Sequence, residues 1–223
     1  MLTAFLCLLS ASLWAQTNKA LTSNTSGWID IMPDESFKGW TRIAIPPDKA
    51  LDPVSQWKLD KARRTIICEG DRGHEWLRYD RELGDLILHV EWRFTKREGL
   101  KGYNSGVFIR NSADGRVWHQ AQVGAGNDGY LFGQTLADGK LTEMKFGPKP
   151  KVNHIKPPGE WNIYEVRCQG PKITLWVNGE VSSEFAAPEV LKGYLGLEAE
   201  GFLIEFRNLK LKLLLDRLMK KRP

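Results

Sequence analysis

Two short segments of this chain alternate strictly between apolar and polar or aromatic residues, and this limits what the chain can fold into. They read LHVEWRF at residues 88–94 and NSGVFIR at residues 104–110. A period of two is the signature of a β-strand with one buried face. The faces turned away from the core carry His89, Glu91, Arg93, Asn104, Gly106, Phe108 and Arg110. If the two strands are neighbours, this face presents a carboxylate, two guanidinium groups and a carboxamide, which is a candidate functional surface.

The rest of the chain predicts more strands of the same kind. About a dozen short apolar segments are separated by Gly, Pro, Asn and Asp turns, with almost no helical periodicity, which is typical of an all-β jelly roll. Asn178-Gly179 is the strongest hairpin signal and predicts a type I′ turn. Residues 124–160 are rich in Gly, Pro and Lys and predict a long loop. With 223 residues and 42% hydrophobic content, one β-sandwich of two antiparallel sheets with a concave ligand face is expected.

The ends of the chain differ from this pattern. Residues 1–15 carry no charged side chain, are mainly apolar and end in small residues, so we expect a signal peptide and an exported, periplasmic or extracellular protein. The apolar run is shorter than the roughly 20 residues that a membrane span needs. Residues 16–27 predict a flexible lead-in, residues 28–215 the single domain, and residues 216–223 a basic tail. Cys68 and Cys168 are either bridged or buried as free thiols.

Charge narrows the class of partner. The formal net charge is +5, and both signs are interspersed along the chain without a basic stripe, so nucleic acid is not an expected partner. The sequence does not constrain the oligomeric state. The nine Trp residues fit core filling, and they also fit a sugar ligand.

Two further segments place polar side chains at alternating positions. WHQAQV puts Gln120 and Gln122 on one face, and YLGLEAEG does the same for Glu198 and Glu200. Carboxylates, planar amides and guanidinium groups suit bidentate hydrogen bonding to vicinal hydroxyls, whereas a solvated face, the alternative, would favour Thr, Lys and Ser. We expect Gly106 and Gly196 to leave room for a ligand against the backbone. The pattern therefore favours a carbohydrate groove.

The ordered set EWR, NSGVFIR, Q-x-Q, PPGEWNIYEV, ITLWVNG and LEAEGFLIEFRNLKL resembles the 3-keto-disaccharide hydrolase domain family. The resemblance runs from about Trp28 to Leu213 and implies a concanavalin A-like, lectin/glucanase-type double sheet. It also implies cleavage of glycosides already oxidised to a ketone at C3. Two positions depart from the family pattern: Gln120-Ala121-Gln122 stands where many members have Glu-x-Gln, and Leu197-Glu198 where many have Leu-Gln.

The implied reaction needs a base for the acidified hydrogen on C2, a stabiliser for the enolate oxygen and an acid for the leaving group. We assign Glu91 as the base, Arg93 or Arg110 as the stabiliser, and Glu198 or Glu200 as the acid. Substrate binding is assigned to Asn104, Phe108, Arg110, Gln120 and Gln122. No cofactor is predicted, because the histidines lack metal-ligand spacing such as His-x-x-x-His, although a divalent metal is not excluded.

Other interpretations use the same residues. Glu91 and Arg93 also fit a plain salt-bridge pair, and His119 is expected to face the core. A conventional glycosidase with two carboxylates about 5 to 9.5 Å apart is an alternative enzyme. A carbohydrate-binding module without a poised acid or base is the non-catalytic alternative.

Overall fold

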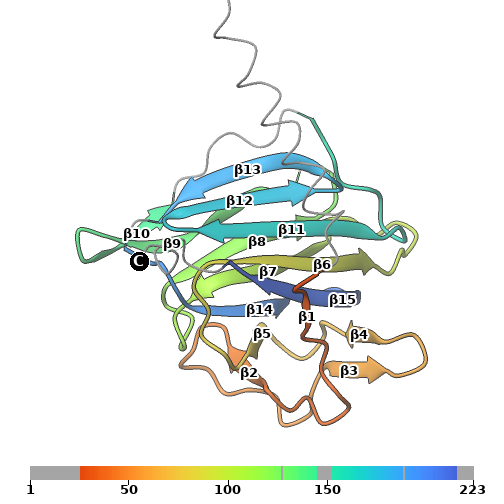
Figure 1. The fold of residues 1–223 in the computed structure, drawn as a ribbon. Coiled ribbons are helices and arrows are strands. Elements are labelled where there is room, and N and C mark those ends of the chain that lie inside the picture. The colour runs from red at the N-terminus through yellow and green to blue at the C-terminus, as the bar shows by residue number, and fades with distance from the viewer. Residues whose placement is uncertain (1–25, 127, 145–151, 188, 215–223) are drawn as a thin grey trace, which may run out of the picture.

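The protein is a β-sandwich of two antiparallel sheets, described here by a computed structural model for residues 26–126, 128–144, 152–187 and 189–214 (Figure 1). These residues contain fifteen strands and no helix, so the all-β prediction is confirmed. The predicted signal peptide (1–15), most of the lead-in (16–27) and the basic tail (216–223) lie outside the described residues.

Sheet A has eight strands, and β6 and β15 lie at its centre. Its order is β13 (Glu180–Ala186), β12 (Lys172–Val177), β11 (Asn162–Gln169), β6 (Leu86–Phe94), β15 (Ile204–Leu213), β4 (Thr65–Cys68) and β3 (Trp57–Asp60), with β1 (Ile29–Asp30) paired to β15.

Sheet B has seven strands and packs face to face on sheet A (Figure 1). Its order is β10 (Lys140–Met144), β9 (Leu131–Ala137), β8 (Trp118–Gly124), β7 (Asn104–Asn111), β14 (Tyr194–Ala199), β5 (Glu75–Tyr79) and β2 (Trp40–Ala44). In its middle the consecutive strands β8 and β7 lie beside β14 and β5, which come from distant parts of the chain.

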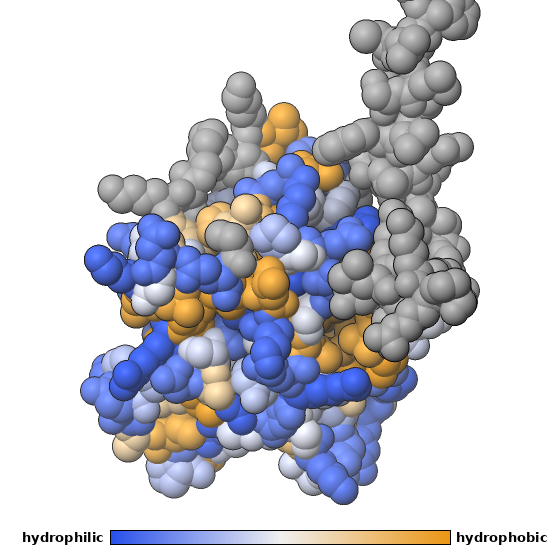
Figure 2. All heavy atoms as spheres, turned by 60° about the vertical axis from the view of Figure 1, so that its left-hand side comes forward, coloured by the Kyte–Doolittle hydropathy of each residue, from blue (hydrophilic) through white to orange (hydrophobic). Residues whose placement is uncertain are grey.

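The core lies between the sheets and is built from the apolar side of each alternating strand. Val90, Trp92 and Phe94 of β6 and Val107 and Ile109 of β7 are all at most 1% exposed. On the surface, hydrophilic residues cover much of the face seen in Figure 2, with hydrophobic ones showing between them. The predicted alternation is thus confirmed for residues 88–94 and for 104–109, whereas Arg110 departs from it.

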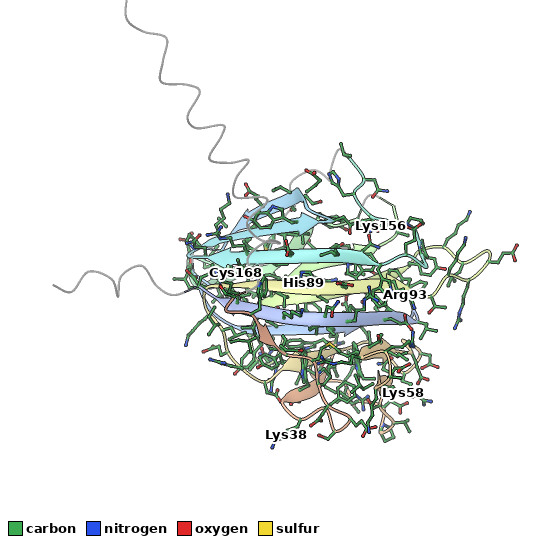
Figure 3. The ribbon with its side chains drawn as sticks, turned by 45° about the vertical axis from the view of Figure 1, so that its right-hand side comes forward. Lys38, Lys58, His89, Arg93, Lys156 and Cys168 are labelled. Atoms are coloured by element: carbon green, nitrogen blue, oxygen red, sulfur yellow. The ribbon has the colours of Figure 1, made fainter. Side chains whose placement is uncertain are left out.

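The two segments are not neighbours, however, and this expectation was wrong. β6 pairs with β11 and β15 in sheet A, whereas β7 pairs with β8 and β14 in sheet B. Since their apolar sides meet in the shared core, their polar faces point in opposite directions. Figure 3 shows His89 and Arg93 along β6, on the outward side of sheet A. Alternation fixes which side chains are buried, but it does not identify the neighbouring strand.

Two turn predictions have different outcomes. Asn178 and Gly179 have φ values of 51° and 93° and join β12 to β13, so the two-residue hairpin is confirmed. The expected long loop at 124–160 instead contains β9 and β10, a hairpin that extends sheet B. Pairing with β8 along an open sheet edge overrides the weak local pattern of these residues.

Both cysteines beyond the predicted signal peptide are buried free thiols. Burial raises the pKa of Cys168 to about 12, so that thiol stays protonated.

Within the described part of the chain, no helix has the length and apolar character needed to cross a membrane.

Candidate active site

The polar face of sheet B gathers six of the nine residues assigned to a site from the sequence. Register places Gln120 opposite Phe108 and Gln122 opposite Gly106, while Gly196 of β14 is also opposite Phe108. Glu198 follows on β14, and Glu200 lies just beyond its end. The assembled set is Asn104, Phe108, Gln120, Gln122, Glu198 and Glu200.

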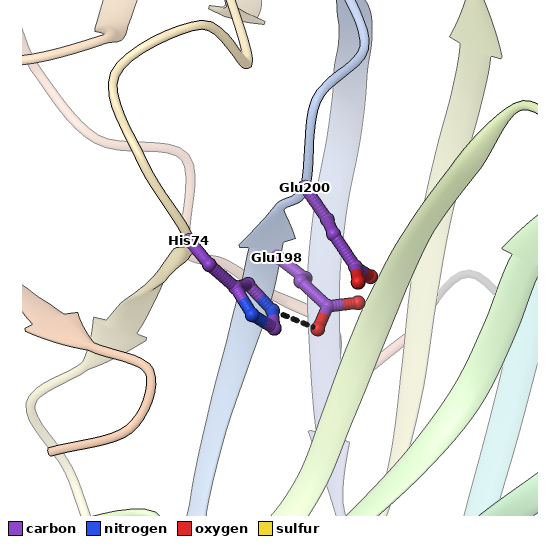
Figure 4. Close-up of side chains that lie close together, drawn as sticks. All are labelled: His74, Glu198 and Glu200. Carbon is purple, nitrogen blue, oxygen red and sulfur yellow. Dashed lines mark hydrogen bonds and ion pairs between the residues drawn. The ribbon is translucent and has the colours of Figure 1, made fainter.

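A histidine that was not assigned from the sequence completes this group. His74 lies directly before β5, and its Nε2 is 2.8 Å from Glu198 Oε1 (Figure 4). One ligand atom from each of His74, Glu198 and Glu200 can be chosen so that all three lie within 4.8 Å of one another. These three side chains are called the His-Glu-Glu cluster below.

Carboxamides orient both carboxylates of the cluster. Gln120 Nε2 donates to Glu198 Oε2 at 2.8 Å, and Asn104 Nδ2 donates to Glu200 Oε2 at 2.6 Å. Gln122 Nε2 in turn donates to Asn104 Oδ1 at 2.6 Å. Among the described residues, no salt bridge joins Glu198 or Glu200 to Lys or Arg. The direct hydrogen-bond partners described above for the two carboxylates are His74 and neutral amide N–H groups.

Burial and proximity shift the protonation of the cluster. Glu198 is 3% exposed, and this burial raises its pKa, while the Glu200 charge adds to the rise and the bond from His74 opposes it. Burial alone would lower the pKa of His74, but the hydrogen bond and the charge of Glu198 outweigh it and raise that pKa. The pKa of both groups is thus raised, so the His74–Glu198 pair holds its proton to a higher pH than an isolated carboxyl or imidazole group would.

Two glycines of this face have a different role from the one expected. A Cβ on Gly196 would lie 2.3 Å from the Trp76 ring, and a Cβ on Gly106 would lie 2.2 Å from Gln120 Nε2. The space beside both glycines is thus filled by protein side chains. They allow Trp76 and Gln120 to lie flat across the sheet, so the expectation that a ligand approaches the backbone there was wrong.

A pocket of about 160 Å³ opens beside the cluster. His74, Gln120 and Glu198 line it on the polar side, and aromatic and aliphatic residues line most of the rest. Its lining is Ala44, Ile45, Pro47, His74, Trp76, Phe108, Asn111, Asp114, Gly115, Trp118, Gln120 and Glu198. A concave, mostly apolar pocket with a few convergent polar groups is the usual form of a small-molecule site.

The cluster also has the composition to hold a divalent cation. An imidazole nitrogen and two carboxylate oxygens suit several divalent ions, and the bonds from Gln120 and Asn104 resemble the outer-shell contacts that orient metal ligands. This grouping has no signature of closely spaced ligands in the sequence, because His74 and Glu198 are 124 positions apart.

Glu91 and Arg93 lie away from this site, on the outer face of sheet A. Glu91 accepts hydrogen bonds from Arg207 Nε and Asn208 Nδ2, each at 2.7 Å, and Arg93 pairs with Glu205. The side chains of Glu91 and Arg93 thus bond to residues of the neighbouring strand β15, including Asn208 at its register irregularity. Their placement on the candidate site was wrong because β6 belongs to the other sheet, and the geometry leaves them without access to the cluster.

Arg110 is also absent from the polar face. Its φ is 53° at an irregularity between β7 and β14, which breaks the alternation and turns the side chain inward. The fully buried guanidinium bonds Asp85 Oδ1 at 3.0 Å and the Gly170 carbonyl at 2.7 Å. Arg110 therefore ties the β11–β12 turn to the start of β6 and cannot contact a ligand on the polar face.

His119 faces the core, as predicted. It is 1% exposed, and its ring nitrogens lie 3.2 Å from the Ile109 carbonyl and 3.0 Å from Thr135 Oγ1. Among the residues that sequence reasoning left unassigned at the site are His74 and Trp76. Their two-residue spacing at the start of the predicted strand 76–79 is the signal that would have placed them on one face.

Comparisons with known proteins agree with this architecture. The sequence model of the 3-keto-alpha-glucoside-1,2-lyase-like domain matches residues 27–212, which confirms the resemblance seen in the motifs. No curated protein matches the chain.

Solved structures match the fold at low sequence identity. A putative glycosyl hydrolase from Parabacteroides distasonis has 17% identity and a TM-score of 0.56, with 89% of this chain and 97% of that chain covered. The carbohydrate binding module CBM66 from Bacillus subtilis has 12% identity and a TM-score of 0.57, with 82% and 98% covered. The concanavalin A-like sandwich is thus confirmed, and at these identities the likeness concerns the fold alone.

Proposed function

Since this chain belongs to the 3-keto-alpha-glucoside-1,2-lyase-like domain family, we propose that it cleaves glycosides that carry a ketone at C3 of the sugar. The observation that carries the proposal is the His-Glu-Glu cluster at the mouth of an aromatic pocket on sheet B. A lyase-type elimination needs a proton acceptor at C2 and a proton donor for the oxygen that leaves C1, and the cluster has groups for both roles.

The first step would be removal of the C2 proton. The C3 ketone acidifies this hydrogen, so a carboxylate suffices as the base. Glu200 suits this role, because Asn104 orients one of its oxygens and it lies at the more open edge of the cluster. The C2–H bond breaks, its electron pair forms the C2–C3 double bond, and the C3 oxygen becomes an enolate.

The His74–Glu198 pair would supply the electrophile and the acid. A proton shared by the two side chains, whose Nε2 and Oε1 atoms are 2.8 Å apart, would donate a hydrogen bond to the enolate oxygen and stabilise the developing negative charge. When the enolate collapses, the C3 carbonyl re-forms, C1–C2 becomes a double bond and the C1–O bond breaks. The leaving oxygen then takes the proton from the pair, and Glu200 holds the proton from C2, so proton and electron counts balance.

The amides would bind the sugar. Gln120, Gln122 and Asn104 form a hydrogen-bonded row beside the cluster. Planar amides can donate to and accept from adjacent hydroxyls. In this mechanism Glu200 takes the role of base that was predicted for Glu91. The His74–Glu198 pair takes the role of oxyanion stabiliser that was predicted for Arg93 or Arg110.

A conventional glycosidase is less well supported by this geometry. Such enzymes place two carboxyl groups about 5 to 9.5 Å apart, on opposite sides of the scissile bond. Glu198 and Glu200 instead project from neighbouring same-face positions at the end of one strand, with oxygens within 4.8 Å. Side-by-side carboxylates suit a step in which one atom of the sugar loses a proton.

One experiment tests the proposal. Purified protein is incubated with an α-linked disaccharide and with its 3-keto form, after EDTA treatment and with added Mn²⁺, because the cluster can hold a cation. We expect release of the aglycone from the keto form alone. Cleavage of the plain disaccharide would establish a glycosidase instead, and absence of cleavage under both metal conditions would favour a binding module.

A further inference from the structure

We propose that the aromatic pocket beside the His-Glu-Glu cluster receives the aglycone and selects a flat apolar aglycone over a second sugar. This rests on the proposed function for the identity of the bond that is broken. His74, Gln120 and Glu198 belong both to the reacting cluster and to the lining of the pocket. The group attached to C1 of a sugar held at the cluster therefore has the pocket as its neighbour.

The aromatic walls are held in fixed orientations by edge-to-face packing. The rings of Trp76 and Phe108 are 5.4 Å apart at 72°, and those of Phe108 and Trp118 are 6.4 Å apart at 89°. Phe132 packs against Trp118 from β9, at 5.1 Å and 85°. Trp118 and Phe132 are both partly exposed, but of the two only Trp118 lines the pocket, so its indole is available to a ligand there. Rings held in this way offer a preformed surface for another flat ring.

The flank toward β2 is aliphatic. Ala44 ends β2, and Ile45 and Pro47 follow it along the pocket lining. In the strand order of sheet B, β7, β14 and β5 lie between β8, which carries Trp118, and β2. Apolar groups therefore border the pocket both at β8 and at β2, on either side of Glu198 and His74. A ligand between these flanks would contact carbon atoms on both sides.

The pocket offers few polar partners away from the cluster. Asn111 Oδ1 already accepts from the His119 amide at 2.9 Å. Asp114 Oδ1 accepts from Ser112 Oγ at 2.6 Å and from the Arg116 amide at 3.1 Å. Most of the remaining lining presents carbon atoms, including those of Phe108, Trp118 and Ile45. The hydroxyls of a second sugar that lie against these surfaces would lack hydrogen-bond partners, which opposes binding. An aromatic aglycone carries no such requirement.

Binding is the appropriate test, because rates would mix recognition with leaving-group chemistry. Calorimetry is done on the full chain carrying Glu200→Gln, which is expected to bind without turning over. The probes are the 3-keto forms of benzyl α-glucoside, methyl α-glucoside and trehalose. The benzyl glycoside is chosen because its aglycone, benzyl alcohol, is attached through an alkyl oxygen, as a second sugar is, and not through a phenolic oxygen.

We expect the benzyl glycoside to bind at least about tenfold more tightly than the disaccharide, in line with one well-made ring contact. Trp118→Ala should remove this preference and leave the methyl glycoside within about threefold, whereas Trp118→Phe should keep most of it. Trp161→Ala is the matched control, since Trp161 packs against Arg93 and Arg207, which belong to sheet A.

Equal or tighter binding of the disaccharide, or a Trp118→Ala variant with unchanged preference, would overturn this inference. The proposed function fails separately, through the cleavage assay on unsubstituted protein. If no keto-glycoside is cleaved while the Trp118-dependent preference holds, the reaction is refuted and the aromatic subsite stands. If keto-disaccharides are cleaved and bound in preference, only the subsite assignment falls.

Discussion

His74 Nε2 lies 2.8 Å from Glu198 Oε1, although the two residues are 124 positions apart in the chain. This contact joins the residue before β5 to the end of β14, and Glu200 lies beside it. Three titratable side chains thereby meet on a face that otherwise carries amides and aromatic rings. The predictions below follow from this arrangement and from the packing that supports it.

Replacing His74 by Asn or Glu198 by Gln should reduce turnover of a 3-keto-glycoside by about 10²- to 10⁴-fold, the usual contribution of a positioned proton donor. The melting temperature and the circular dichroism spectrum should show that the variants are folded. Glu91→Gln is the matched control, since Glu91 lies on the outer face of sheet A. A large loss of turnover in Glu91→Gln, together with unchanged turnover in His74→Asn, would contradict this assignment and place the active site on sheet A.

Gly196→Ala should destabilise the protein by about 1–3 kcal/mol, because the new methyl group would lie 2.3 Å from the Trp76 ring in an already packed layer. Gly84→Ala is the control, since its Cβ would meet only the Leu191 carbonyl at 3.8 Å. Urea unfolding measures both variants. Equal free energies of unfolding for the two would contradict the role given to Gly196.

Arg110→Met should lower the free energy of unfolding by about 3 kcal/mol, because it leaves Asp85 and two carbonyl groups without their buried partner. Arg207→Met, on the outer face with a side chain 37% exposed, should cost less than about 1 kcal/mol. The Arg110 variant should retain its KM once it is folded. A raised KM without loss of stability would restore Arg110 to substrate binding.

Stability should fall as the pH is lowered below 6.5, partly because of His119. Burial lowers the pKa of His119 from its ordinary value of 6.5 to about 4. The unfolded chain therefore takes up a proton first, and the free energy of unfolding decreases as the pH falls from 6.5 toward 4. The full effect is about 3 kcal/mol, since one pKa unit corresponds to about 1.4 kcal/mol.

His119→Gln should flatten this dependence between pH 6.5 and 5, the range above most carboxylate titrations, while lowering stability at pH 7.5 through lost hydrogen bonds. Chemical unfolding at several pH values provides the measurement. An unchanged slope in the variant would show that other groups control the acid sensitivity.

The local structure and the residue types of the candidate site could be predicted from the sequence alone. Period-two alternation identified β6, β7, β8 and β14 and the side chains that each buries, because alternation along a strand is a property of the backbone alone. Asn178-Gly179 identified the hairpin, since its positive φ angles favour those two residues. The motif order along the chain indicated the family, and Asn104, Gln120, Gln122, Glu198 and Glu200 were selected correctly as one polar face.

Which polar faces meet depends on the tertiary packing of distant strands. Glu91 and Arg93 alternate as regularly as Asn104 and Phe108, yet strand order sends them to opposite sides of the sandwich. Arg110 left the polar face because one residue with positive φ interrupted the alternation. His74 joined it through a strand pairing between β5 and β14 that spans more than half of the chain. Strand neighbours are chosen by packing between distant segments, and that information is not contained in the pattern of any single segment.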